Sequence, residues 1–69
     1  MIRIKDENLL ERISKIHDVR IKNNLTFRDI ANVGHTTPEV IFHMESGICK
    51  NVPEIYALVR RLEQSILMK

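Results

Sequence analysis

Tryptophan is absent from this chain, and cysteine, glycine, proline and aromatic residues are scarce. The 69 residues include one Cys, two Gly, two Pro, one Tyr and two Phe. A single cysteine excludes an intramolecular disulfide framework and fits a reducing compartment, so we expect a cytoplasmic protein. Few Gly and Pro residues together with 43% hydrophobic residues are typical of a globular domain rather than of a disordered chain.

Long hydrophobic runs and a strong charge of one sign are missing as well. No apolar stretch approaches the roughly 20 residues of a membrane span. The charged residues near the start precede no uninterrupted apolar segment of the kind that signal peptides contain. We therefore expect no membrane partner. The net charge of +2 permits a nucleic acid as partner but does not require one.

Catalytic and metal-binding patterns are lacking too. The three histidines do not stand at metal-ligand spacing with Cys49, and neither CxxC nor HxxxH occurs. Cys49 has no base beside it in sequence and is better explained as a packing residue than as a nucleophile. A chain this small could hardly enclose a substrate pocket of about 300 Å³ or more. We expect no enzyme, no metal and no cofactor.

Apolar residues at intervals of three and four predict two long amphipathic helices. The first is expected over residues 8–22, with Asp6 or Asn8 as its N-cap and Asn23-Asn24 at its end. Its inward face consists of Leu9, Leu10, Ile13, Ile16 and Val19. The second is expected over residues 52–68, after an Asn51 cap. Its inward face consists of Ile55, Leu58, Val59, Leu62 and Ile66.

Residues 25–47, LTFRDIANVGHTTPEVIFHMESG, predict two short helices joined by a tight corner, over residues 26–33 and 37–46. Thr26 is the expected N-cap of the first helix. Gly34 is expected to make the corner, because glycine adopts positive φ at little cost. Thr36 or Thr37 is the expected N-cap of the second helix, and Pro38 is its expected first residue. Gly47 is expected to end it.

Residues 1–7 form an N-terminal arm that is too short to show a clear secondary-structure pattern. Ile2 and Ile4 alternate with Arg3 and Lys5, which allows either a short strand that pairs with another copy or a frayed terminus. Of the two we favour the frayed or loosely docked terminus. The whole chain is then one all-α domain, a small four- to five-helix bundle with a helix-turn-helix, marginal in stability unless it oligomerises.

Several short motifs occur in one order between residues 16 and 62. Val19-Arg20 precedes Leu25-Thr26, Ile30-Ala31 follows, and the stretch Ile41-x-x-Met44-Glu45-x-Gly47 comes next. This order resembles the phage-repressor and Cro-type (XRE-family) DNA-binding domains, lambda-repressor-like in fold, whose most recognisable segment is Ile-x-x-Ile-Glu-x-Gly. In a gapless match the family's turn glycine falls on His35, so either the corner is shifted or His35 adopts that conformation.

The resemblance implies that the second helix of the pair enters the major groove of double-stranded DNA. The expected base contacts are Thr37, Pro38, Glu39, Phe42 and His43. In this reading Glu39 accepts from cytosine N4 and Phe42 packs on a thymine methyl. The alternative is that Glu39 is only a first-turn charge and Phe42 fills a crevice. The expected phosphate contacts are Arg28, Thr36, Ser46, Lys50 and Asn51.

A homodimer is expected, because one small domain makes few base contacts and two copies multiply affinity. The expected interface is the end of the last helix, with Ile2 and Ile4 as further candidates, and comprises Leu62, Ile66, Leu67 and Met68. The alternative is that Ile66 and Leu67 pack back on the first helix.

Two functions compete at this point. The first is a sequence-specific DNA-binding transcription regulator, a small phage or mobile-element repressor. The second is a protein-binding module on the same fold, such as an antirepressor, a host-enzyme inhibitor or an antitoxin. The second is favoured by the apolar and acidic recognition helix, since exposed apolar patches mark partner sites.

Overall fold

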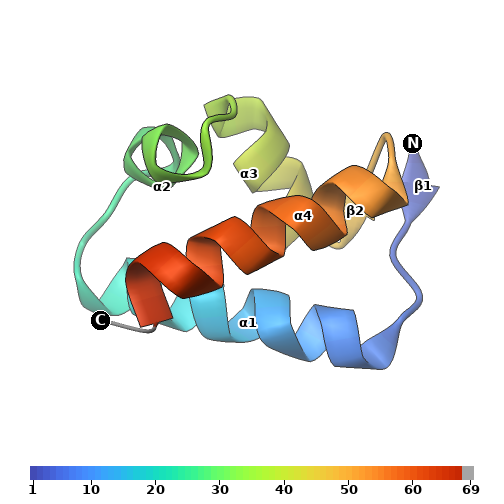
Figure 1. Cartoon of the computed structure of the whole chain (residues 1–69), viewed down its shortest axis with the longest axis horizontal. Coiled ribbons are helices and arrows are strands. Elements are labelled where there is room, and N and C mark those ends of the chain that lie inside the picture. The colour runs from blue at the N-terminus through green and yellow to red at the C-terminus, as the bar shows by residue number, and fades with distance from the viewer. Residues whose placement is uncertain (68–69) are drawn as a thin grey trace.

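The structure is a computed structural model and describes residues 1–67. Helices pack around one core, and a very short two-stranded sheet lies at the end of the molecule that holds the N-terminus (Figure 1). The elements are β1 (Ile2–Arg3), α1 (Glu7–Lys22), α2 (Phe27–Gly34), α3 (Pro38–Glu45), β2 (Ile48–Cys49), α4 (Val52–Leu62) and a terminal π-helical turn, η1 (Glu63–Leu67). The expected small, mostly helical bundle is confirmed. None of the helices within residues 1–67 is both long and apolar enough to cross a bilayer.

Polar side chains cap each helix at its start. Asp6 rather than Asn8 caps α1, with its carboxylate accepting from the backbone N–H of Asn8 at 2.9 Å and of Leu9 at 3.3 Å. Thr26 and Asp29 form a reciprocal capping box on α2. Asn51 accepts from the Glu54 N–H at 3.1 Å and begins α4. These caps follow from local sequence, because each satisfies N–H groups that have no partner within the helix.

The corner between α2 and α3 follows one of the two alternatives that the sequence left open. His35, not Gly34, takes the left-handed conformation, with φ 56° and ψ 46°. Gly34 is instead the last residue of α2 and lies against α4, where a Cβ would come 2.5 Å from Cδ1 of Leu58. Glycine at position 34 therefore allows α2 and α4 to pack closely, and the expectation that it makes the turn was wrong.

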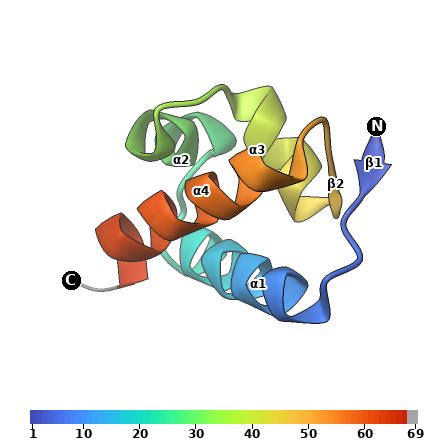
Figure 2. The same ribbon diagram turned by 45° about the vertical axis from the view of Figure 1, so that its right-hand side comes forward.

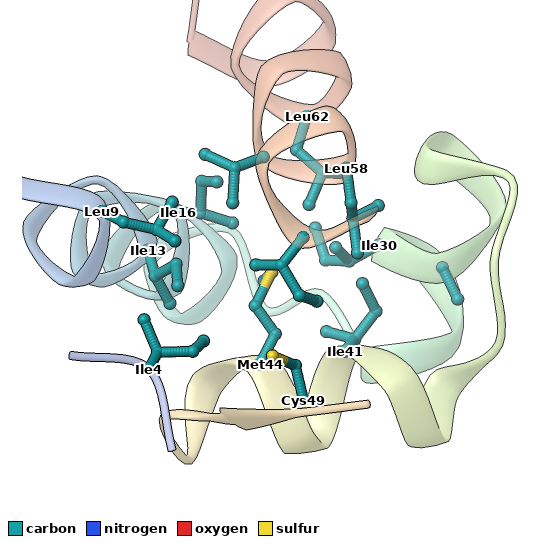
Figure 3. Packing of buried hydrophobic residues seen from close by; sticks show 13 residues of the cluster. Ile4, Leu9, Ile13, Ile16, Ile30, Ile41, Met44, Cys49, Leu58 and Leu62 are labelled. Atoms are coloured by element: carbon teal, nitrogen blue, oxygen red, sulfur yellow. The ribbon is translucent and has the colours of Figure 1, made fainter. Parts of the chain in front are cut away.

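The core is formed by side chains from every helix. Figure 3 shows them converging between α1, α2, α3 and α4. Ile30 and Ala31 come from α2, and Ile41 and Met44 from α3, and all four are buried. The remaining buried hydrophobic residues are Ile4, Leu9, Ile13, Ile16, Cys49, Ile55, Leu58, Val59 and Leu62. Cys49 is thus one of the core residues.

The N-terminus is not frayed. β1 pairs antiparallel with β2, with Ile2 opposite Cys49 and Arg3 opposite Ile48. The Ile4 N–H donates to the Gly47 carbonyl at 2.8 Å, and the Ile4 side chain is only 4% exposed. The arm is docked and not frayed, because burial of Ile4 and this backbone pairing hold it against its own chain. The strand of the other alternative does form, and it pairs with β2 of the same chain.

The last helix was expected over residues 52–68, and residues 52–67 are helical. The α-helical part ends at Leu62, and residues 63–67 continue it as the π-helical turn η1. Leu62 is fully buried in its own core, so it cannot lie on a dimer surface, and the same holds for Ile4. Ile66 packs partly buried against the core, whereas Leu67 is partly exposed. Met68 lies outside the described residues.

Candidate nucleic-acid interface

The outer face of α3 is set by what the helix buries. Ile41 and Met44 have no exposed surface, and they turn one side of α3 fully toward the core. Pro38, Glu39 and Phe42 lie on the opposite side and are exposed. Figure 2 shows α2 and the start of α3 on one side of α4, with α1 on the other. The helix pair therefore forms one outer surface of the molecule.

An ion pair anchors the end of α3 to α1. The Arg20 guanidinium donates from Nε to Glu45 Oε2 at 2.7 Å and from Nη2 to Oε1 at 2.9 Å. The ring nitrogen Nδ1 of His17 lies 2.6 Å from Oε1. Burial raises the pKa of Glu45, and the hydrogen bonds from Arg20 and His17 lower it. The lowering is the larger effect, so the pKa of Glu45 lies below its ordinary value. Glu45 is therefore a fixed carboxylate that holds α3 in place.

Aromatic rings extend this anchor to the outer face. The Arg20 guanidinium carbon lies 4.4 Å from the centre of the Phe27 ring, a cation–π contact. The Phe27 ring meets the Phe42 ring edge to face, with centroids 5.7 Å apart and planes at 75°. Phe42 itself is 51% exposed. An exposed aromatic ring thus stands on the outer face of α3, supported from below.

A cleft of about 460 Å³ lies beside α3, between the α2–α3 corner and α4. Its charged walls are balanced, with Lys50 and Arg61 against Glu39 and Glu54. The sequence predicted that so small a chain could hardly enclose a pocket of about 300 Å³ or more. The cleft exceeds that volume, but it is an open groove and not an enclosed pocket.

Arg61 was not singled out in the sequence. Its Nε donates to the Gly34 carbonyl at 3.1 Å and so ties α4 to the end of α2. The signal that could have found it is its position three residues after Leu58, which places both side chains on the side of α4 that faces α2. Arg61 also lines the cleft with one positive charge.

The residues expected to contact bases fall into two groups. Thr37, Glu39 and His43 line the cleft, with His43 half-buried in its wall. Pro38 and Phe42 do not line it, and lie exposed on α3. Thr37 also caps α3, since its hydroxyl oxygen accepts from the Val40 N–H at 3.4 Å.

The residues expected to contact phosphates differ in exposure and in whether their side chains already have hydrogen-bond partners. Lys50 is exposed at the cleft, where Thr36 and Asn51 also lie, and Arg28 is exposed on α2 outside it. The Asn51 amide oxygen is used in capping α4. The Ser46 hydroxyl donates to the Phe42 carbonyl at 2.9 Å, so its only donor already has a partner. The structure therefore favours Lys50, Thr36 and Arg28 over Ser46 as donors to an anion.

Metal ligation is not indicated by the arrangement. Within residues 1–67 no three His, Cys, Asp or Glu side chains are grouped so that they could hold a metal ion.

The fold defines a small helical bundle in which a short helix pair presents one exposed face. No model of a known protein family matches the chain, and neither a curated protein nor a solved structure matches it.

Proposed function

We propose that the protein is a sequence-specific DNA-binding transcription regulator of the phage-repressor and Cro type. The observation that carries the proposal is the division of α3 into two sides. Ile41 and Met44 are fully buried, while the opposite side, with Glu39 and Phe42, is exposed. A helix held in this way by its neighbours can be laid into a major groove, which accommodates one α-helix.

The charges around α3 suit contacts to the DNA backbone. Arg28 on α2 and Lys50 after β2 are exposed, and Thr36 and Lys50 both line the cleft. Contacts of this kind position a protein on the duplex without reading its sequence. Glu39 is repelled by phosphate unless it finds a donor, and the cytosine amino group in the major groove is such a donor.

A dimer remains part of the proposal, on a smaller surface than the sequence suggested. Leu67 is partly exposed beside the half-buried Ile66, and Ile2 is exposed on β1. We expect the C-terminal surface of Ile66 and Leu67 to meet a second copy, so that two α3 helices read half-sites one helical turn apart.

The experiment is selection of bound duplexes from a random DNA library by the full chain, followed by fluorescence anisotropy at two salt concentrations. We expect enrichment of a two-fold symmetric motif and weaker binding at higher salt. Phe42→Ala should change the enriched motif. Ile21→Ala should keep it, because Ile21 is equally exposed but lies on α1. Binding no better than to random DNA would exclude the proposed function.

A second candidate is a protein-binding module on the same face. One support is the exposed Phe42 ring beside Phe27, because exposed apolar side chains mark partner sites. The other is that the cleft is lined by two basic side chains, Lys50 and Arg61, and two acidic ones, Glu39 and Glu54, if histidines are left out. In that case the selection shows no enrichment, and the Phe42→Ala variant loses a partner that the Ile21→Ala variant still captures.

A further inference from the structure

We infer that Phe42, positioned by Phe27, reads the C5-methyl group of thymine, so that the protein selects DNA sites by a methyl contact rather than by paired hydrogen bonds. This inference rests on the proposed DNA-binding function. It assigns the base that is read and adds Phe27 as a positioning residue.

The first support is the absence from α3 of the side chains that make paired hydrogen bonds to purines. Bidentate recognition of guanine or adenine uses Arg, Lys, Asn or Gln. None of these occurs between Pro38 and Glu45. Glu39 can only accept a hydrogen bond, and the Ser46 hydroxyl already donates to the Phe42 carbonyl. Phe42 is the exposed large hydrophobic side chain of α3, and the apolar group that DNA offers in the major groove is the thymine methyl.

The second support is the way in which the Phe42 ring is held. Arg20 is fixed by Glu45 and by the Leu25 carbonyl, which it contacts from Nη1 at 3.1 Å. Its guanidinium stacks on Phe27, and the Phe27 ring meets Phe42 edge to face. A methyl contact distinguishes thymine from the other bases better when the aromatic ring is held in one orientation. The contacts from Arg20 through Phe27 restrict the orientation of the Phe42 ring.

The chemistry of the contact allows a direct test. Deoxyuridine pairs with adenine as thymine does but lacks the methyl group. Burying one methyl-sized group corresponds to about a four-fold change in affinity for each contacted thymine. The replacement leaves the phosphates and the charge of the duplex unchanged, so a loss of affinity reports the methyl alone.

The experiment starts from the best duplex selected from the random library by the full chain. Each thymine is replaced in turn by deoxyuridine, and the dissociation constant is measured by anisotropy. We expect a loss of about four-fold at one position or two adjacent positions in each half-site. 5-Methylcytosine, paired with guanine at that position, should bind more tightly than cytosine there.

Two variants assign the contact to the aromatic pair. Phe42→Ala should bind the thymine and deoxyuridine duplexes equally, and Phe27→Leu should reduce the difference between them, with unfolding by urea measured alongside. Ile21→Ala is the control and should keep the full difference. Selection of a DNA motif with no sensitivity to deoxyuridine would overturn the methyl reading and leave the DNA-binding proposal intact. Failure to select any motif would overturn both.

Discussion

The Arg20 guanidinium on α1 and the Glu45 carboxylate on α3 are joined by two hydrogen bonds of 2.7 and 2.9 Å. Both side chains are largely buried, with 11% and 7% of their surfaces exposed. Glu45 is also the last residue of α3. The pair therefore ties the end of α3 to α1 and helps to set the direction of the outer face of α3.

Removing the charge of Glu45 should destabilise the protein. In Glu45→Gln the largely buried Arg20 charge loses its partner, and we expect a loss of about 3 kcal/mol in the free energy of unfolding. The measurement is urea unfolding. Glu63→Gln is the matched control, because Glu63 pairs with Arg12 in a more exposed position and should cost about 0.5 kcal/mol. Equal losses in the two variants would contradict the prediction.

Acid should weaken the fold through the same carboxylate. The pKa of Glu45 is lowered in the folded state, so its contribution to stability is present above the ordinary pKa and is lost as the pH falls through the folded value. We expect the urea midpoint to decrease below about pH 4.5, the ordinary value for this carboxyl. Part of this decrease should remain in Glu45→Gln, because hydrogen bonds from Tyr56 and Arg12 lower the pKa values of Asp6 and Glu63.

A methyl group at position 34 should be poorly tolerated. In Gly34→Ala the new Cβ meets Cδ1 of the buried Leu58, and we expect a loss of about 1–2 kcal/mol despite the better helix propensity of alanine. The double variant with Leu58→Ala is the control. In that background the clash is relieved, so the added cost of Gly34→Ala should become smaller. An unchanged cost would show that the contact with Leu58 is not its cause.

Glycine at position 35 should stabilise the corner. His35 has φ 56°, a left-handed conformation that costs a residue with a Cβ roughly 1–2 kcal/mol, whereas glycine adopts it at little cost. We expect His35→Gly to raise the free energy of unfolding by about 1 kcal/mol in urea. Asn24 has the same φ, but asparagine tolerates it better, so Asn24→Gly should gain less. A larger gain at position 24 would be inconsistent with this reasoning.

A phosphate contact and a base contact should be separable in the proposed complex. Lys50→Ala is expected to weaken binding equally for all DNA sequences and to reduce the slope of log K against log salt by about 1. Phe42→Ala should change the preferred sequence with little effect on that slope. Anisotropy titrations at several salt concentrations distinguish the two. A Lys50→Ala variant with an unchanged slope would remove Lys50 from the phosphate contacts.

The sequence by itself determined most of the helical segments and the caps of α2 and α4. Thr26 and Asn51 accept from N–H groups three residues further on, and Pro38 begins α3 where its missing N–H would have had no partner within the helix. The roles of these residues are therefore readable from short segments. The apolar spacing of Ile41 and Met44 likewise gave the buried side of α3, and with it the exposed side on which the candidate site lies.

Only the tertiary structure decided the contacts between distant segments. Three of these contacts join residues that are far apart in the chain. Leu58 approaches Gly34, Ile4 is buried in the core, and Arg61 donates to the Gly34 carbonyl. The same holds for the support that Phe27 gives to Phe42. Local propensity describes a residue and its neighbours along the chain, whereas these contacts arise when packed helices bring remote side chains within a few ångströms.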